Sequence, residues 1–109
     1  MALEKFRKQP AEKDWKAVNF EERLRNETTP SVPDTLASIT SATATDYMTV
    51  AASPEVLGTG AYAPYLDGEY LYFFAQEGTS GGVYKFTFVV TTNNGQVAEK
   101  DILMYVVEN

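Results

Sequence analysis

The sequence predicts an all-β domain, an antiparallel β-sandwich with an N-terminal extension. About seven short segments of strand character follow one another, separated by turn residues and without helical segments between them. The second half alternates apolar and polar residues, as half-buried strands do. The 109 residues correspond to one domain, and a hydrophobic fraction of 44% suffices for one core. We expect residues 1–26 to form an arm and residues 27–109 to form the sandwich.

The charged residues divide the chain at nearly the same place. Residues 1–25 carry seven of the nine basic side chains against five acidic ones, a net charge of +2. The remainder carries two basic against ten acidic side chains, a net charge of −8. An acidic body repels phosphate, so nucleic acid is not an expected partner. The basic arm could instead contact an acidic surface on a neighbouring copy.

Neither disulfides nor membrane insertion is expected. The chain has no cysteine, so its stability must come from the core. The first ten residues lack the apolar region of a signal peptide, and no apolar run approaches membrane-spanning length. We therefore expect no membrane partner.

The arm is open to more than one interpretation. Met1–Lys8 could be helical. Val18 and Phe20 fit a first strand, because they alternate with polar neighbours. A short helix starting at Asn19, with Glu22 three residues later as a capping box, is the competing interpretation.

The next segments predict a turn and two strands. Residues 27–34 contain two prolines and are expected to form a turn. Residues 36–45 are rich in Thr and Ser without clean alternation, which predicts a bulged or weak strand. Tyr47–Ala52 is expected to be a short strand with Met48 and Val50 on one side.

Pro54–Gly68 is expected to be a long connection, and Gly58-Thr-Gly60 within it a flexible turn. Tyr70–Gln76 follows and is apolar at nearly every position, which predicts a strand buried on both faces. Val83–Thr92 and Val97–Val107 flank Asn93-Asn94-Gly95 and are expected to form a β-hairpin.

The register of this hairpin follows from its apolar faces. A two-residue turn would place Phe88 opposite an acidic residue. A three-residue turn with Gly95 in the left-handed region places Phe86 opposite Ile102. We expect this second register, although it puts Lys100 opposite Phe88 and requires its ammonium group to reach solvent at the end of the sheet.

The start of the hairpin carries a further signal. In Gly82-Val83-Tyr84, a tyrosine opens the next-to-last strand just after a turn. Immunoglobulin-like domains place their tyrosine corner at this position, where the hydroxyl bonds to backbone a few residues upstream. A tyrosine corner here would fit an immunoglobulin-like sandwich. The alternative is that Tyr84 is a core aromatic residue with a solvated hydroxyl.

The composition argues against an enzyme. The chain has neither histidine nor cysteine, the two most versatile catalytic side chains. It contains no phosphate loop, dinucleotide fingerprint or zinc spacing. Asp67-Gly68-Glu69 lacks the further oxygen ligands of a calcium loop and reads as a solvated turn. We predict no catalytic residue, no cofactor and no metal.

Four aromatic residues outside the expected core are candidate contacts to a protein partner. They are Phe6 and Trp15 in the arm, and Tyr62 and Tyr65 in the long connection. Tryptophan and tyrosine are enriched at protein interfaces. Alternatively, Trp15 folds back onto the sandwich, and the two tyrosines cover the end of the sandwich.

Two blocks of sequence resemble a known group of proteins. One runs from Gly82 through Tyr84, Thr92 and Gly95 to Ile102; the other comprises Phe6-Arg-Lys8-Gln-Pro10 and Asp14-Trp15 on to Phe20 and Leu24. Both resemble small immunoglobulin-like proteins of tailed bacteriophages, called fiber-tail adaptor or head–tail region proteins. The length of the Pro54–Gly68 connection and Gln96, which stands where a basic residue is common, depart from their pattern.

The resemblance implies a structural protein of the virion, in the tail or neck, assembled in the host cytoplasm. Its partners would be other virion proteins, and it would be present as a homo-oligomeric ring or in several copies. Copy number, position in the particle and the protein contacted do not follow from the sequence. The alternative function is a carbohydrate-binding module that uses Tyr62 and Tyr65.

Overall fold

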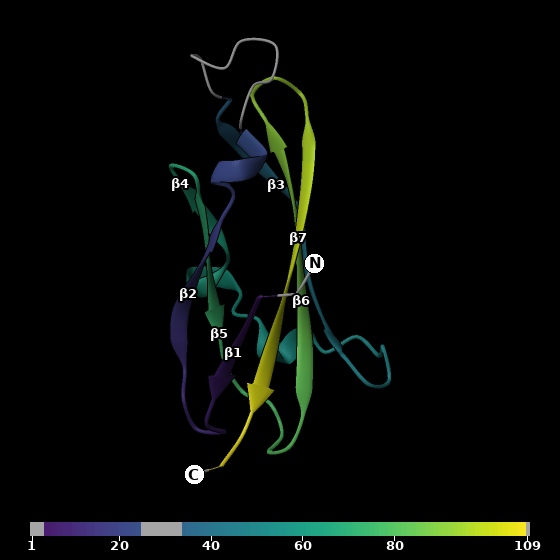
Figure 1. Cartoon of the computed structure of the whole chain (residues 1–109). Coiled ribbons are helices and arrows are strands. Elements are labelled where there is room, and N and C mark those ends of the chain that lie inside the picture. Colours follow the sequence, from purple (N-terminus) through teal and green to yellow (C-terminus); the bar gives the residue numbers. More distant parts are fainter. Residues whose placement is uncertain (1–3, 25–33, 109) are drawn as a thin grey trace.

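The regular structure of the described residues consists of seven strands in two sheets (Figure 1). The computed structural model describes residues 4–24 and 34–108. One sheet has the order β1-β7-β6-β3 and the other β2-β5-β4, and the helical segments of the described residues are three short 3-10 turns. This confirms the all-β class. The strands are β1 (Glu4–Lys8), β2 (Asp14–Asn19), β3 (Leu36–Asp46), β4 (Tyr65–Asp67), β5 (Tyr70–Ala75), β6 (Val83–Thr92) and β7 (Val97–Val106), and the turns are η1 (Glu21–Leu24), η2 (Pro54–Val56) and η3 (Gly60–Tyr62).

The two sheets share one core. Phe73 of β5 packs against Phe86 and Phe88 of β6, with ring centroids 4.9 and 4.8 Å apart. Along β6, every second residue from Tyr84 to Thr92 is buried, as the alternation predicted. The inward faces of both sheets are thus removed from water together, which is the main source of stability of such a two-layer fold.

The predicted hairpin is present in the predicted register. Phe86 lies opposite Ile102, and Gly95 has a φ of 83°, in the left-handed region. Lys100 lies opposite Phe88, and its Nζ donates a hydrogen bond of 2.7 Å to the carbonyl of Asn19. The ammonium group therefore finds a partner on the other sheet instead of only reaching solvent.

Of the two interpretations of Tyr84, the structure has the one with a hydrogen bond to upstream backbone. Its hydroxyl accepts a bond of 2.9 Å from the backbone N–H of Thr79, five residues upstream. The ring is buried, so Tyr84 fixes the turn before β6 while its body fills the core.

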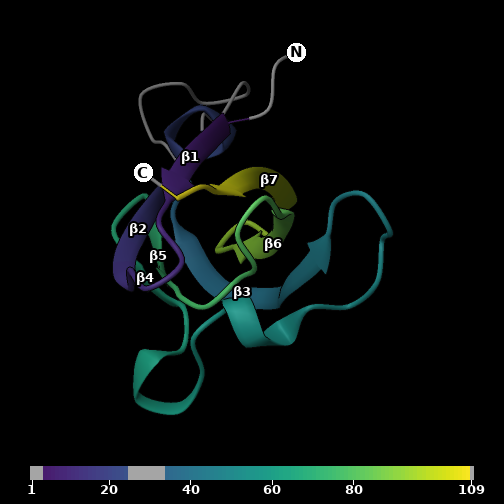
Figure 2. The ribbon, with the colours of Figure 1, turned by 90° about the horizontal axis from the view of Figure 1, so that it is seen from below.

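The strand predicted over residues 36–45 has the predicted bulges. The register between β3 and β6 shifts between Leu36 and Ser38 and again between Ile39 and Ser41. The strand predicted over Tyr47–Ala52 is wrong, because residues 47–49 form a turn. Figure 2 shows this loop standing away from the two sheets. No second layer of structure covers its apolar side chains, so the alternation of Met48 and Val50 did not indicate a strand.

The N-terminal segment is part of the sheets, which corrects the expectation of a peripheral arm. β1 pairs in parallel with β7, and β2 pairs antiparallel with β5. Val18 and Phe20 are fully buried in the core. The sequence leaves open whether Met1–Lys8 is helical or extended; residues 4–8 form the extended edge strand β1, and charged side chains are typical of edge strands.

The two interpretations of the residues around Asn19, a first strand and a short helix, are both partly correct. The strand β2 ends at Asn19, whose Oδ1 accepts a hydrogen bond of 2.8 Å from the N–H of Glu21 at the start of η1. The expected turn at residues 27–34 and the boundary between residues 26 and 27 lie outside the described residues, except Asp34. Residues 4–24 therefore cannot be separated from the two sheets as an independent extension.

Candidate functional site

A group of aromatic side chains covers the outer side of the three-stranded sheet. Strand geometry places alternate residues on opposite faces, and on β5 Leu71, Phe73 and Ala75 point into the core. The residues between them point outward, together with Trp15 of β2 opposite Phe74 and Tyr65 of β4 opposite Tyr72. We call this group the aromatic face; it comprises Trp15, Tyr62, Tyr65, Tyr70, Tyr72 and Phe74.

The rings of the aromatic face hold one another in place. Trp15 meets Phe74 and Tyr65 nearly edge-on, with centroids 5.2 and 5.3 Å apart. Tyr62 lies 4.6 Å from Phe74, and Tyr65 stacks on Tyr72 at 5.2 Å. Such offset and edge-to-face pairs are favourable arrangements. The surface is therefore preorganised, and a partner would lose little side-chain entropy on these residues when binding.

A buried glycine allows Tyr62 to join this group. The N–H of Gly58 donates a hydrogen bond of 2.8 Å to the carbonyl of Phe74. A Cβ at position 58 would lie 2.7 Å from the carbonyl oxygen of Tyr62 and 2.8 Å from Cβ of Phe74. Gly58 thus lets the connection approach β5 closely. Its expected role as a flexible turn is wrong.

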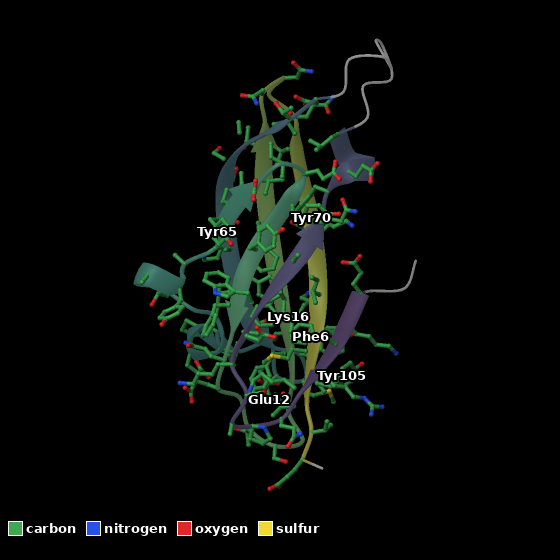
Figure 3. All side chains as sticks on the ribbon, turned by 90° about the vertical axis from the view of Figure 1, so that its left-hand side faces the viewer. Phe6, Glu12, Lys16, Tyr65, Tyr70 and Tyr105 are labelled. Carbon is green, nitrogen blue, oxygen red and sulfur yellow. The ribbon has the colours of Figure 1, made fainter. Side chains whose placement is uncertain are left out.

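Three of the four predicted contact residues come together on the aromatic face. Tyr62 and Tyr65 are 50% and 47% exposed, and Trp15 is half-buried. Trp15 packs on its own sheet, which is the alternative considered for it, yet part of the side chain stays accessible. Figure 3 looks onto this side of the molecule and shows Tyr65 and Tyr70 on it.

Phe6 does not belong to the aromatic face. Its ring lies 6.2 Å from Phe73 and 6.4 Å from Phe86, where it extends the core between β1 and β2. The Nζ of Lys16 lies 5.1 Å from the centre of this ring, at cation–π distance. Phe6 is therefore a partly buried packing residue with a charged neighbour.

Three members of the aromatic face were not recognised from the sequence as surface residues. Tyr70, Tyr72 and Phe74 alternate with the core residues of β5, but an apolar residue at nearly every position predicted burial on both faces. The signal that could have separated the faces is the composition. The inner residues Leu71, Phe73 and Ala75 have no polar group, whereas two of the three outer ones are tyrosines.

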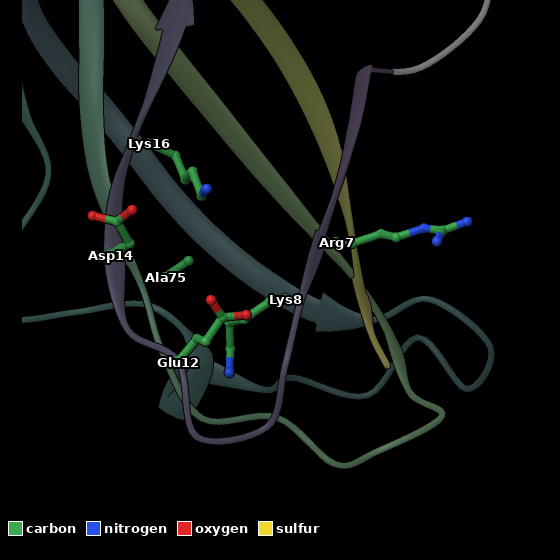
Figure 4. Close-up of a pocket in the computed structure, with 6 residues that line it drawn as sticks. All are labelled: Arg7, Lys8, Glu12, Asp14, Lys16 and Ala75. Carbon is green, nitrogen blue, oxygen red and sulfur yellow. The ribbon is translucent and has the colours of Figure 1, made fainter. Parts of the chain in front are cut away.

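A second, polar hollow lies between the start of β2 and the end of β1. Its volume is about 40 Å³, room for about one water molecule. Figure 4 shows Lys8 beside Glu12 in it, with Arg7 directed away. The hollow is lined by Arg7, Lys8, Glu12, Asp14, Lys16 and Ala75.

Lys8 has a structural role in this hollow. Its buried Nζ donates hydrogen bonds of 2.8 and 3.0 Å to the carbonyls of Gln9 and Pro10. Burial lowers the pKa of Lys8 below its usual value, although Glu12 and Glu77 act in the opposite direction. Lys8 thereby ties the turn between β1 and β2, and the hollow leaves no room for a substrate.

The remaining described residues can be compared with the requirements of a metal site and of a membrane-spanning helix. No cluster of three Asp or Glu residues that could hold a metal ion occurs within residues 4–24 and 34–108. The same residues contain no helix with the length and apolar character needed to cross a membrane. No protein-family model matches the chain, and no curated protein sequence matches it.

Proposed function

We propose that this chain is a non-enzymatic, immunoglobulin-like domain that binds another protein through the aromatic face, as a structural adaptor of a tailed-phage virion. The observation that carries the binding function is the gathering of Trp15, Tyr62 and Tyr65 with three further rings on one outward surface. Outward-facing aromatic residues contribute little to the core of their own chain. Contact with a partner would bury them.

The chemistry of the aromatic face favours a protein partner. Tryptophan and tyrosine dominate the residues that contribute most to protein–protein binding, and they cluster in this way at the centre of interfaces. Trp15 stands at about 70° to both Tyr65 and Phe74. These rings do not form one flat platform on which a sugar ring could stack. The uneven surface suits the side chains of another protein.

Two features support the immunoglobulin-like fold. The orders β2-β5-β4 and β3-β6-β7 correspond to the B-E-D and C-F-G strands of immunoglobulin domains. The bond between the hydroxyl of Tyr84 and the N–H of Thr79 corresponds to a tyrosine corner. β1 pairs with the last strand, as a first strand that has moved onto the C-F-G sheet would.

The virion part of the proposal rests on the resemblance of two sequence blocks to phage adaptor proteins. In this setting the domain needs no catalytic group, and it acts in the tail or neck by bridging other virion proteins in several copies. The site of assembly is the host cytoplasm. The block from Gly82 to Ile102 covers β6, the hairpin turn and the first part of β7, and the other block covers most of β1, β2 and η1.

The proposal can be tested with purified proteins. The chain is mixed with each product of its neighbouring genes, and complexes are measured by size-exclusion chromatography with light scattering. Tyr62→Ser with Tyr65→Ser should weaken a complex about 30-fold or more, as hot-spot substitutions do. Tyr47→Ser is the matched control, because this tyrosine is 44% exposed but lies outside the aromatic face.

Two outcomes would contradict the proposal. In one, the double variant binds the partner as tightly as the control variant does, so that the aromatic face is not the contact. In the other, no gene product binds, and soluble oligosaccharides bind in a manner that depends on Tyr62 and Tyr65. The second outcome would support the carbohydrate-binding alternative.

A further inference from the structure

The loop between β3 and η2 presents two apolar side chains to solvent. Met48 and Val50 are 79% and 78% exposed, more than any other large hydrophobic residue of the described chain. The loop is nevertheless well organised. The carboxylate of Asp46 accepts hydrogen bonds of 2.9 and 3.1 Å from the N–H groups of Met48 and Thr49. The N–H of Val50 donates to the carbonyl of Asp46 at 2.8 Å.

Val50 holds a backbone conformation that is unfavourable for its residue type. Its φ is 54°, in the left-handed region that glycine and asparagine tolerate and that β-branched residues avoid. Strain of this kind persists only where the surrounding structure holds it in place, and it clusters at functional sites. An asparagine or glycine would fold more easily at position 50 but would not present an aliphatic side chain. We call Met48 and Val50 the apolar knob.

An apolar groove borders the same end of β3. It has a volume of about 220 Å³ and no charged residue in its lining. Its walls are small or aliphatic, so the groove suits side chains such as methionine and valine. The residues that form most of the wall are Ala42, Ala44, Ala52, Pro54 and Leu57.

We propose that this edge of the molecule is a two-fold self-association surface, in which the apolar knob of one copy enters the groove of a second copy. A two-fold contact pairs the same surface on both subunits, so each copy supplies one knob and one groove. Because Ala42 and Ala44 of β3 and Ala52 flank the loop that carries the knob, both halves of the contact lie on one edge. The dimer buries two knobs at once, and no third protein is needed to cover them.

The groove between β1 and β2 fits the apolar knob less well. It contains Phe6, Phe73 and Ile102, but Glu4, Lys5 and Lys16 also line it. Charged groups would have to be desolvated by an aliphatic side chain placed there. The uncharged groove beside β3 requires no such desolvation, which is why we assign the contact to it.

The proposed dimer uses residues other than those of the aromatic face. The knob and β3 belong to one sheet and its loop, and the aromatic face belongs to the outer side of the other sheet. A dimer would carry two aromatic faces and could bind two partners or one repeated partner with increased avidity. Self-association does not depend on the proposed function, and the two can fail separately.

Sedimentation equilibrium of the full chain over about three decades of concentration tests the proposal. The wild type should show a reversible monomer–dimer equilibrium. Met48→Ser with Val50→Asn should raise the dimer dissociation constant at least about tenfold. Val50→Asn alone should keep or raise the melting temperature of the monomer, measured at concentrations below the dimer dissociation constant, because asparagine tolerates the left-handed region. Val97→Asn is the control, since Val97 is 66% exposed at a distant hairpin end.

The second half of the contact is tested by Ala52→Glu, which places a charge in the groove and should weaken the dimer equally. Three results would overturn the proposal. These are a wild type that stays monomeric throughout, a closed ring of more than two copies, and a knob variant that dimerises as the wild type does. The Tyr62→Ser and Tyr65→Ser variant should dimerise normally, which separates this test from that of the aromatic face.

Discussion

Replacing Phe86 by alanine is the most direct perturbation of the shared core. The side chain is fully buried, and its ring centre lies 4.9 Å from Phe73, 6.2 Å from Phe88 and 6.4 Å from Phe6. Truncating a buried phenylalanine costs about 3–5 kcal/mol, because a cavity remains. The loss of three aromatic neighbours, each pair worth about 0.5–1.5 kcal/mol, places this site in the upper part of that range.

Urea denaturation followed by circular dichroism measures this loss. Phe74→Ala is the matched control, because Phe74 is half-buried and its truncation leaves no enclosed cavity. The loss of its pairs with Trp15 and Tyr62 should cost about 1–3 kcal/mol. At a common m-value of roughly 1–2 kcal/mol/M, the midpoint should fall by about 2–5 M for Phe86→Ala and by a smaller amount, about 0.5–3 M, for Phe74→Ala.

One result would contradict the assignment of Phe86 to the core and Phe74 to the outer face. Equal midpoints for the two variants, or a larger loss at Phe74, would mean that the inner and outer faces have been exchanged. The alanine variant could lose most of a total stability of roughly 5–15 kcal/mol. If Phe86→Ala does not fold, Phe86→Leu, which retains most of the side-chain volume, takes its place in the comparison with Phe74→Ala.

Three further predictions concern single contacts. Burial works to raise the pKa of Asp34, but the N–H groups of Thr35 and Asn94, which donate to its Oδ1 at 2.8 and 3.1 Å, and the nearby side chain of Thr92 hold the pKa below its usual value. The ionised Asp34 side chain therefore contributes its full stabilisation above the unfolded pKa of about 3.9, and this contribution is lost as the pH falls through the lower folded pKa. Melting temperatures measured over this pH range should show the loss in the wild type, and Asp34→Asn should lack this contribution to the decrease. Gly58→Ala should displace Tyr62 from Phe74 and destabilise the domain by about 1–3 kcal/mol, and an unchanged near-ultraviolet dichroism spectrum would argue against the close approach. Tyr84→Phe should cost about 1–3 kcal/mol in urea, because it leaves the N–H of Thr79 without its partner.

Local patterns predicted the C-terminal hairpin well. Apolar and polar residues alternate over most of residues 83–92, and Asn93-Asn94-Gly95 restricts the turn, so pairing between neighbouring segments followed from the sequence. The same reasoning could not find β1, which pairs in parallel with β7 across almost the whole chain. A short charged edge strand has no apolar pattern of its own, because its stability comes from the strand beside it.

The aromatic face, too, could be predicted from the sequence only in part. The composition of the long connection identified Tyr62 and Tyr65, and Trp15 was recognised as the lone tryptophan of a charged segment. Their meeting depends on β2 and β4 pairing with opposite edges of β5, which no local pattern encodes. The exposed turn at residues 47–49 was mistaken for a strand for a related reason. Apolar residues predict burial only where a second layer exists to cover them.

The fluorescence of Trp15 tests the central claim most directly. Trp15 is the only tryptophan of the chain and lies on the aromatic face, so its emission reports on that surface alone. The chain is titrated with each neighbouring gene product that lacks tryptophan or has been replaced by a tryptophan-free variant. The account predicts that a binding partner shifts the emission to shorter wavelength and reduces quenching by acrylamide, with the same midpoint as complex formation by light scattering. A complex that forms while emission and quenching stay unchanged would place the contact elsewhere and contradict the account.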